Sequence, residues 1–135
     1  MESSTLTALR VFLVEDSPLL RQVLSETLAT IPGVQVVGAA DTETEALDEL
    51  ADSPADLVVV DIELRRGSGL GVLKALKTDP TRYHAVRPVV LTNFAHATIR
   101  HRCTELGCST VFDKSMQVDD LIRHVEQQRM QHVQG

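Results

Sequence analysis

The sequence has few cysteines, no long apolar run and fewer basic than acidic residues, and each shortage excludes a class of protein. Cys103 and Cys108 are the only cysteines among 135 residues. Both lie in one predicted helix and the residues just after it, and this placement is not that of a disulfide framework. We therefore expect the protein to reside in a reducing compartment. No apolar run approaches the roughly 20 residues that span a bilayer, and the opening segment MESSTLTALR lacks the apolar core of a signal peptide.

The charge balance argues against nucleic acid as a partner. Thirteen Lys and Arg residues stand against 19 Asp and Glu residues, a formal net charge of −6. A nucleic-acid surface needs a basic patch that displaces counterions from phosphates. We therefore expect a cytoplasmic protein that binds neither membranes nor nucleic acid.

The remaining composition is that of a folded globular domain, with 43% hydrophobic and 24% charged residues. A chain of this length fits one domain with an ample core. We place that domain at residues 10–129, after a lead-in at 1–9 and before a polar tail at 130–135.

Short apolar segments recur along the chain and predict five β-strands, at 10–14, 34–40, 57–61, 86–92 and 109–112. The central segment, LVVVD, is apolar without a break until Asp61. Such a run is typical of a strand that is buried on both faces of a parallel sheet.

Amphipathic segments with helix-start and helix-stop residues separate these strands. Ser17, Thr42 and Ser68 stand where they can cap the first three helices, Gly107 can end the fourth, and the fifth extends toward the tail. On the third helix we expect a buried face of Leu70, Leu73 and Leu76. Five alternating strands and helices predict an α/β fold with a doubly wound, flavodoxin-like parallel sheet of strand order 2-1-3-4-5.

Polar side chains lie at the carboxyl ends of four of the predicted strands: Glu15 and Asp16, then Asp61, Thr92 and Lys114. An acid after a strand is usually a turn or capping residue, so each signal alone is weak. Together, however, they converge on the carboxyl edge of the sheet, where open α/β folds bind ligands. Two like charges about 4 Å apart repel by roughly 4 kcal/mol at an effective dielectric of about 20, so three carboxylates favour a bound cation.

Hard oxygen ligands suit Mg²⁺, and Mg²⁺ commonly shares a phosphate. A carboxylate beside Mg²⁺ is a plausible nucleophile towards phosphorus. Mg²⁺ and Lys114 can neutralise charge on the phosphoryl oxygens, and the hydroxyl of Thr92 can bind a third phosphoryl oxygen.

With these residues in these positions, the chain resembles the receiver domain of two-component response regulators. The resemblance rests on an ordered set of segments that covers most of the chain, VFLVEDSPLLR, LVVVDIEL, GSGLGVLKALK, PVVLTN and VFDKS. It implies that Asp61 is the phosphoacceptor, that Thr92 is the switch hydroxyl and that Lys114 contacts the phosphoryl group. It also implies phosphoryl transfer from a histidine kinase or phosphotransfer protein.

The resemblance likewise implies the ligands of Mg²⁺: the carboxylates of Glu15, Asp16 and Asp61 and the backbone carbonyl of Glu63. The pair Glu15–Asp16 replaces the commoner Asp–Asp. Ser115 stands where many receivers have proline, and Val111 stands where a switch aromatic is usual. A coupling of threonine to an aromatic side chain cannot operate here in its usual form.

Two positions beside the predicted site suggest a hypothesis about phosphoryl lifetime. Glu63 and Phe94 lie two residues after Asp61 and Thr92, where family members flank the route of the hydrolytic water. An acid and a bulky ring there predict slow decay.

We expect a stand-alone signalling protein, not an enzyme, that acts on an unknown downstream protein. The sequence leaves open whether the chain forms a homodimer. One alternative is a small Mg²⁺-dependent phosphatase with an Asp nucleophile, although Glu63 occupies the place of its usual acid and no cap domain is present. Another is a pseudo-receiver that binds partners without phosphorylation. The five histidines match no zinc-site spacing.

Overall fold

The computed structural model describes residues 8–134, and its centre is one sheet of five parallel strands. The strands are β1 (Leu9–Val14), β2 (Val34–Ala40), β3 (Leu57–Val60), β4 (Arg87–Thr92) and β5 (Val111–Asp113). Their order across the sheet is β2-β1-β3-β4-β5, and every neighbouring pair is parallel. The predicted flavodoxin-like α/β fold and its strand order are therefore confirmed.

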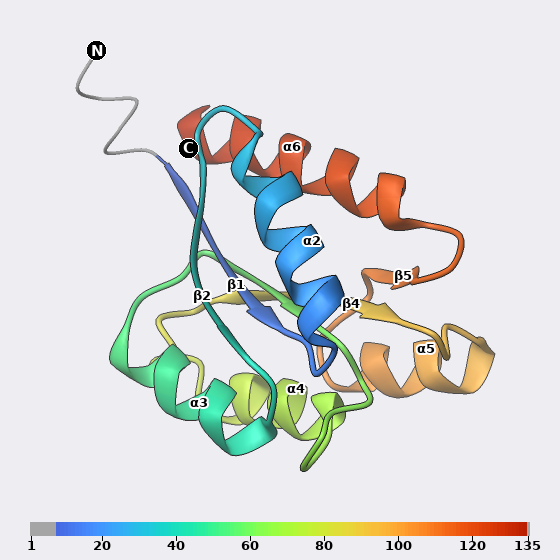
Figure 1. The fold of residues 1–135 in the computed structure, drawn as a ribbon. Helices are drawn as coiled ribbons and strands as arrows, with labels where there is room; N and C mark the ends of the chain where they lie inside the picture. The colour runs from blue at the N-terminus through green and yellow to red at the C-terminus, as the bar shows by residue number, and fades with distance from the viewer. Residues whose placement is uncertain (1–7, 135) are drawn as a thin grey trace.

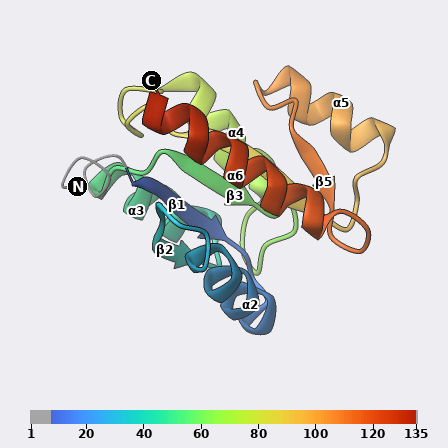
Figure 2. The ribbon, with the colours of Figure 1, turned by 90° about the horizontal axis from the view of Figure 1, so that it is seen from above.

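Five helices alternate with the strands and cover both faces of the sheet (Figure 1). They are α2 (Pro18–Ala29), α3 (Glu43–Asp52), α4 (Gly69–Thr78), α5 (Ala97–Glu105) and α6 (Val118–Gln134). Helices α2 and α6 lie on one face, and α3, α4 and α5 lie on the other. Seen from above, α2 lies towards the β2 edge and α6 lies across the middle of the sheet (Figure 2).

Side-chain caps begin the first three helices, as predicted. The Oγ of Ser17 accepts a hydrogen bond from the Leu20 amide at 3.2 Å, and the Oγ of Ser68 accepts one from the Leu70 amide at 3.0 Å. Thr42 Oγ1 accepts from the Glu45 amide at 3.2 Å. Each cap satisfies an N–H group that has no partner within the helix, and so it fixes the residue at which the helix starts.

The central strand contributes to the core on both sides of the sheet. All four residues of β3 are buried. Leu57 and Val59 pack in the cluster that includes residues of α2 and α6, whereas Val58 and Val60 pack in the cluster on the α3 and α4 side. Because successive side chains of a strand point to opposite faces, only a continuous apolar run fits this position.

Two details differ from the sequence-based expectation. Strand β5 begins at Val111, two residues later than predicted, and continues to Asp113. On α4, Leu73 and Leu76 are buried as expected, but Val72 and Gly69 complete the buried face in place of Leu70, which is partly exposed. Gly69, in the first turn of α4, lies directly against the backbone of Asp61 and Ile62, and Leu70 packs against the core from a partly exposed position.

Regular elements lie at both ends of the described part. Strand β1 includes Leu9 of the predicted lead-in, and residues 1–7 lie outside the described part. Helix α6 runs through the predicted tail to Gln134, and residue 135 lies outside the described part. None of the helices between residues 8 and 134 combines the length and the hydropathy that a bilayer span requires.

Candidate functional site

The carboxyl ends of four strands place the predicted polar residues at one edge of the sheet. Of the residues that the structure describes, the buried polar or charged ones are Glu15, Asp61 and Thr92, with side chains that are 3%, 4% and 0% exposed. All three were singled out from the sequence as strand-end residues. Burying such groups is unfavourable unless they are paired, so this edge is where the fold departs from a purely apolar interior.

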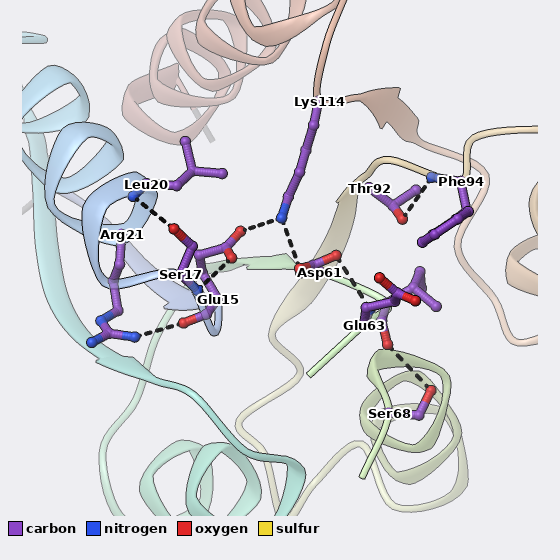
Figure 3. Close-up of polar contacts among 11 residues, drawn as sticks. Glu15, Ser17, Leu20, Arg21, Asp61, Glu63, Ser68, Thr92, Phe94 and Lys114 are labelled. Atoms are coloured by element: carbon purple, nitrogen blue, oxygen red, sulfur yellow. Dashed lines mark hydrogen bonds and ion pairs between the residues drawn. The ribbon is translucent and has the colours of Figure 1, made fainter. Parts of the chain in front are cut away.

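Lys114 supplies the partner for two of these groups (Figure 3). Its Nζ donates to Asp61 Oδ2 at 2.8 Å and forms an ion pair with Glu15 Oε1 at 2.9 Å. The side chain reaches the site from just after β5, and its backbone amide donates to the carbonyl of Thr92 on β4. One ammonium therefore serves two buried carboxylates.

The two carboxylates remain poorly solvated in spite of this ammonium. Burial raises the pKa of Asp61, and the hydrogen bond from Lys114 only partly offsets the rise. Burial likewise raises the pKa of Glu15, and the negative charge of Asp61 adds to it. Burial alone would lower the pKa of Lys114, but its hydrogen bonds to Asp61 and Glu15 outweigh burial and raise it, so the ammonium stays charged.

Glu15, Asp16 and Asp61 each place a carboxylate oxygen within 4.8 Å of the others. This is a set of hard anionic ligands, and among the described residues Lys114 is the cation that forms ion pairs with it. Its chemistry fits Mg²⁺, which prefers carboxylate and carbonyl oxygens and tolerates open positions filled by water or phosphate.

Backbone contacts hold Glu15 and Asp61 in place. Glu15 Oε2 accepts from the Ser17 amide at 2.9 Å, and the Glu15 carbonyl accepts from Arg21 Nη1 at 2.7 Å. Asp61 Oδ1 accepts from the Glu63 amide at 3.3 Å. Glu63 is thus adjacent to the site, and its carbonyl remains a predicted metal ligand.

Thr92 lies on the far side of Asp61 from Glu15 (Figure 3). Its Oγ1 accepts a hydrogen bond from the Phe94 amide at 3.1 Å, and the side chain of Phe94 is exposed. Val111, in the place of the expected aromatic, is buried. The hydroxyl of Thr92 is therefore engaged with the loop that leads to α5.

Arg100 is a residue whose role the sequence did not indicate. Its guanidinium donates to the carbonyls of Ala95 at 2.8 Å and Val111 at 2.9 Å, and its Nη2 lies 3.4 Å from Gln117 Oε1. It joins the loop after Thr92 to β5 and to the segment after Lys114. An arginine on a polar helix gives no sequence signal for such a contact, because it is expected to face solvent.

Comparison with known proteins agrees with this geometry. Residues 11–126 match the family model of the response regulator receiver domain. A protein-glutamate methylesterase/protein-glutamine glutaminase of Desulfotalea psychrophila is 39% identical over 85 residues, which are 63% of this chain and 23% of that protein. A protein of the same description from Anaeromyxobacter dehalogenans is 32% identical over 102 residues, which are 76% of this chain and 27% of that protein.

The chain thus spans about a quarter of the length of these curated relatives. Among solved structures, a LuxR-family two-component response regulator from Aurantimonas superposes with a TM-score of 0.80 at 24% identity, over 90% of this chain and 84% of that one. The response regulator domain of Thermotoga maritima CheB gives a TM-score of 0.77 at 21% identity, over 95% and 98% of the two chains. At these identities the structural likeness concerns the fold.

Proposed function

The chain belongs to the response regulator receiver domain family, and on that premise we propose that it accepts a phosphoryl group on Asp61. Receiver domains are signalling modules of phosphorelays, and the donor here is a histidine kinase or a phosphotransfer protein. The observation that supports this best is the placement of Lys114, whose Nζ contacts both Asp61 and Glu15 at the carboxyl edge of the sheet.

Asp61 acts as the nucleophile in this proposal. A carboxylate oxygen attacks phosphorus, the P–N bond of the donor phosphohistidine breaks, and the electron pair of that bond returns to the imidazole nitrogen. Lys114 is already charged and is within reach of the transferred oxygens, so it can neutralise negative charge without a proton transfer.

The acidic cluster would hold Mg²⁺ through Glu15, Asp16 and Asp61, with the Glu63 carbonyl as a further ligand. A bound ion would supply positive charge to the cluster and to the incoming phosphoryl group. Before transfer, the cluster itself has one ammonium for three carboxylates, so a divalent cation supplies the missing positive charge.

The readout of phosphorylation involves the loop after β4. Thr92 Oγ1 accepts from the Phe94 amide, and the proton of the same hydroxyl can be donated to a phosphoryl oxygen on Asp61. A movement of the hydroxyl towards that oxygen therefore shifts the Phe94 amide that is bonded to it. Arg100 contacts Ala95 in the same loop and Val111 on β5, so the change extends to the surface formed by α5 and β5.

We propose that this surface contacts the downstream protein, in the cytoplasm as is usual for the family. The methylesterase and glutaminase activities named for the longer relatives are not assigned to this chain. Transfer to Asp61 makes the chain a phosphoprotein that signals by changed protein–protein contacts.

Intact mass spectrometry after incubation with acetyl phosphate and Mg²⁺ tests the proposal. We expect one labile phosphoryl adduct on the wild type and none on Asp61→Asn. Asp113→Asn is the matched control, because Asp113 also ends a strand but its carboxylate accepts hydrogen bonds from Ser115, whereas the Lys114 ammonium contacts Asp61 and Glu15. It should be labelled as the wild type is. An unlabelled wild type at every Mg²⁺ concentration would refute the proposal and favour a pseudo-receiver.

A further inference from the structure

The segment after the phosphoacceptor, which we term the site loop (residues 62–68), is closed at its base. Glu63 and Ser68 pair across it in an isolated antiparallel bridge. The Gly69 amide donates to the Ile62 carbonyl at 2.9 Å, and the Ser68 hydroxyl lies 3.4 Å from the same oxygen. The position of Ser68 is therefore coupled to that of Glu63, which lies beside Asp61.

The first turn of α3 contacts the site loop from the outside, chiefly through Glu43. The Glu43 amide donates to the Arg66 carbonyl at 3.1 Å, and Glu43 Oε1 accepts from the Ser68 amide at 2.9 Å. One residue thus binds the loop at two points, on either side of Gly67. Beside it, Arg65 forms two hydrogen bonds with Asp41, at 3.0 and 3.3 Å.

The sequence of the first turn of α4 makes room for this carboxylate. A Cβ built at Gly71 would overlap both carboxylate oxygens of Glu43. The negative charge lies against the amino-terminal end of α4, where the helix dipole and its unpaired N–H groups favour an anion. Glycine at 71, in the GSGLG segment, is therefore explained by a residue 28 positions earlier in the chain.

We infer that Glu43 is a positioning residue for the Mg²⁺ site, acting through the site loop. Its carboxylate holds Ser68, the bridge from Ser68 holds Glu63, and the Glu63 carbonyl is thereby kept beside the acidic cluster. The inference rests on the proposed function, since it concerns the same metal site. No Glu43 atom needs to touch the ion.

Three variants separate positioning from charge and from stability. Glu43→Ala removes the acceptor for the Ser68 amide. Glu43→Gln keeps an oxygen acceptor and removes only the charge. Gly71→Ala leaves residue 43 unchanged, but the added Cβ pushes its carboxylate away. Because alanine favours a helix more than glycine does, a loss of metal affinity in this variant does not arise from a weaker helix. Glu45→Ala is the matched control, since Glu45 is an exposed acid on the same turn.

Mg²⁺ affinity of the unphosphorylated protein, measured by isothermal titration calorimetry, is the first readout. We expect the dissociation constant to rise roughly 10-fold in Glu43→Ala and Gly71→Ala, the size usual for partners that orient metal ligands. Glu43→Gln and Glu45→Ala should stay close to the wild type. In acetyl phosphate labelling, the Mg²⁺ concentration for half-maximal rate should rise by the same factor, with the maximal rate at saturating Mg²⁺ retained.

Unchanged Mg²⁺ affinity in Glu43→Ala and Gly71→Ala overturns the inference, as does an equal loss in Glu43→Gln and Glu43→Ala. If the wild type binds Mg²⁺ but is not labelled on Asp61, the proposed function fails, and the affinities alone still decide the role of Glu43. If the wild type binds no Mg²⁺, both fail.

Discussion

Neutralising the phosphoacceptor should stabilise the fold, because Asp61 is held as an anion in a site that favours its neutral form. The perturbation is Asp61→Asn, which keeps the size of the side chain and an oxygen that can accept from Lys114. Glu15 then no longer shares the ammonium of Lys114 with a second charged carboxylate. The expected result is a higher free energy of unfolding in the absence of Mg²⁺.

The magnitude follows from the geometry. At an effective dielectric of about 20, the 2.8 Å contact with Lys114 attracts Asp61 by about 6 kcal/mol. Glu15 and Asp16, each with an oxygen within 4.8 Å, each repel it by about 3.5 kcal/mol. Attraction and repulsion nearly cancel, so burial of the carboxylate decides the sign. We expect a gain of about 1–2 kcal/mol, or about 4 °C in Tm per kcal/mol for a chain of this size.

Thermal and urea unfolding at pH 7 without Mg²⁺ measure this gain. The folded-state pKa of Asp61 is raised, so the penalty on the wild type begins above the unfolded-state pKa and is complete above the folded-state pKa, where Asp61 is ionised in the folded protein. The advantage of Asp61→Asn should therefore disappear as pH falls towards the unfolded value of about 4. Mg²⁺ at 100 times its dissociation constant should stabilise the wild type by about 2.7 kcal/mol and the variant by much less.

Asp113→Asn gives the opposite sign and serves as the control. Hydrogen bonds from Ser115 hold the pKa of Asp113 below its usual range, so its ionised form is favoured in the folded state and the substitution should not stabilise. Equal stability of Asp61→Asn and the wild type at pH 7, or an advantage that persists unchanged at low pH, would refute the electrostatic reasoning.

Three further predictions concern groups around the site and the sheet. Lys114→Met leaves two buried carboxylates without a cation and should lower the free energy of unfolding at pH 7 by about 3–5 kcal/mol, as urea unfolding would measure; a loss under 1 kcal/mol would contradict the pairing. Gly69→Ala places a Cβ against the Asp61 carbonyl and 2.8 Å from Ile62 Cα. It should lose about 1–3 kcal/mol in the same assay and slow labelling of Asp61, and wild-type values would contradict the close contact. Burial opposes ionisation of Asp56, but its two hydrogen bonds with the Arg10 side chain lower its pKa, so Asp56→Asn should lose about 1.5–3 kcal/mol at pH 7. The difference in stability between Asp56→Asn and the wild type should be present above a pH of about 4 and should vanish in stronger acid, as the pH falls through the folded-state pKa of Asp56. A difference that does not change with pH would contradict this prediction.

The order of the strands and the edge that carries the site could be predicted from the sequence. The run from Leu57 to Val60 requires burial on both faces, and parallel strands bring their carboxyl ends to one edge. Glu15, Asp61, Thr92 and Lys114 each lie at the carboxyl end of such a strand, so their convergence needed no knowledge of side-chain packing. The caps at Ser17, Thr42 and Ser68 were also readable, because a cap depends on residues within one turn.

Other features depend on segments that meet only in the folded chain. That Lys114 contacts Glu15 as well as Asp61 follows from where β5 ends relative to β1 and β3. The face of α4 is set by the close approach of Gly69 to the Asp61 backbone, which helical periodicity alone does not register.

The sequence by itself determined the elements, their alternation and the residues at the strand ends, since these follow from local periodicity, capping and the geometry of parallel sheets. Only the tertiary structure decided that Glu43 holds Ser68 and that Arg100 joins Ala95 to Val111. Both are polar residues on helices, for which solvent exposure is the default expectation. Their partners are backbone carbonyls and amides, and groups of this kind carry no residue-specific signal in a sequence.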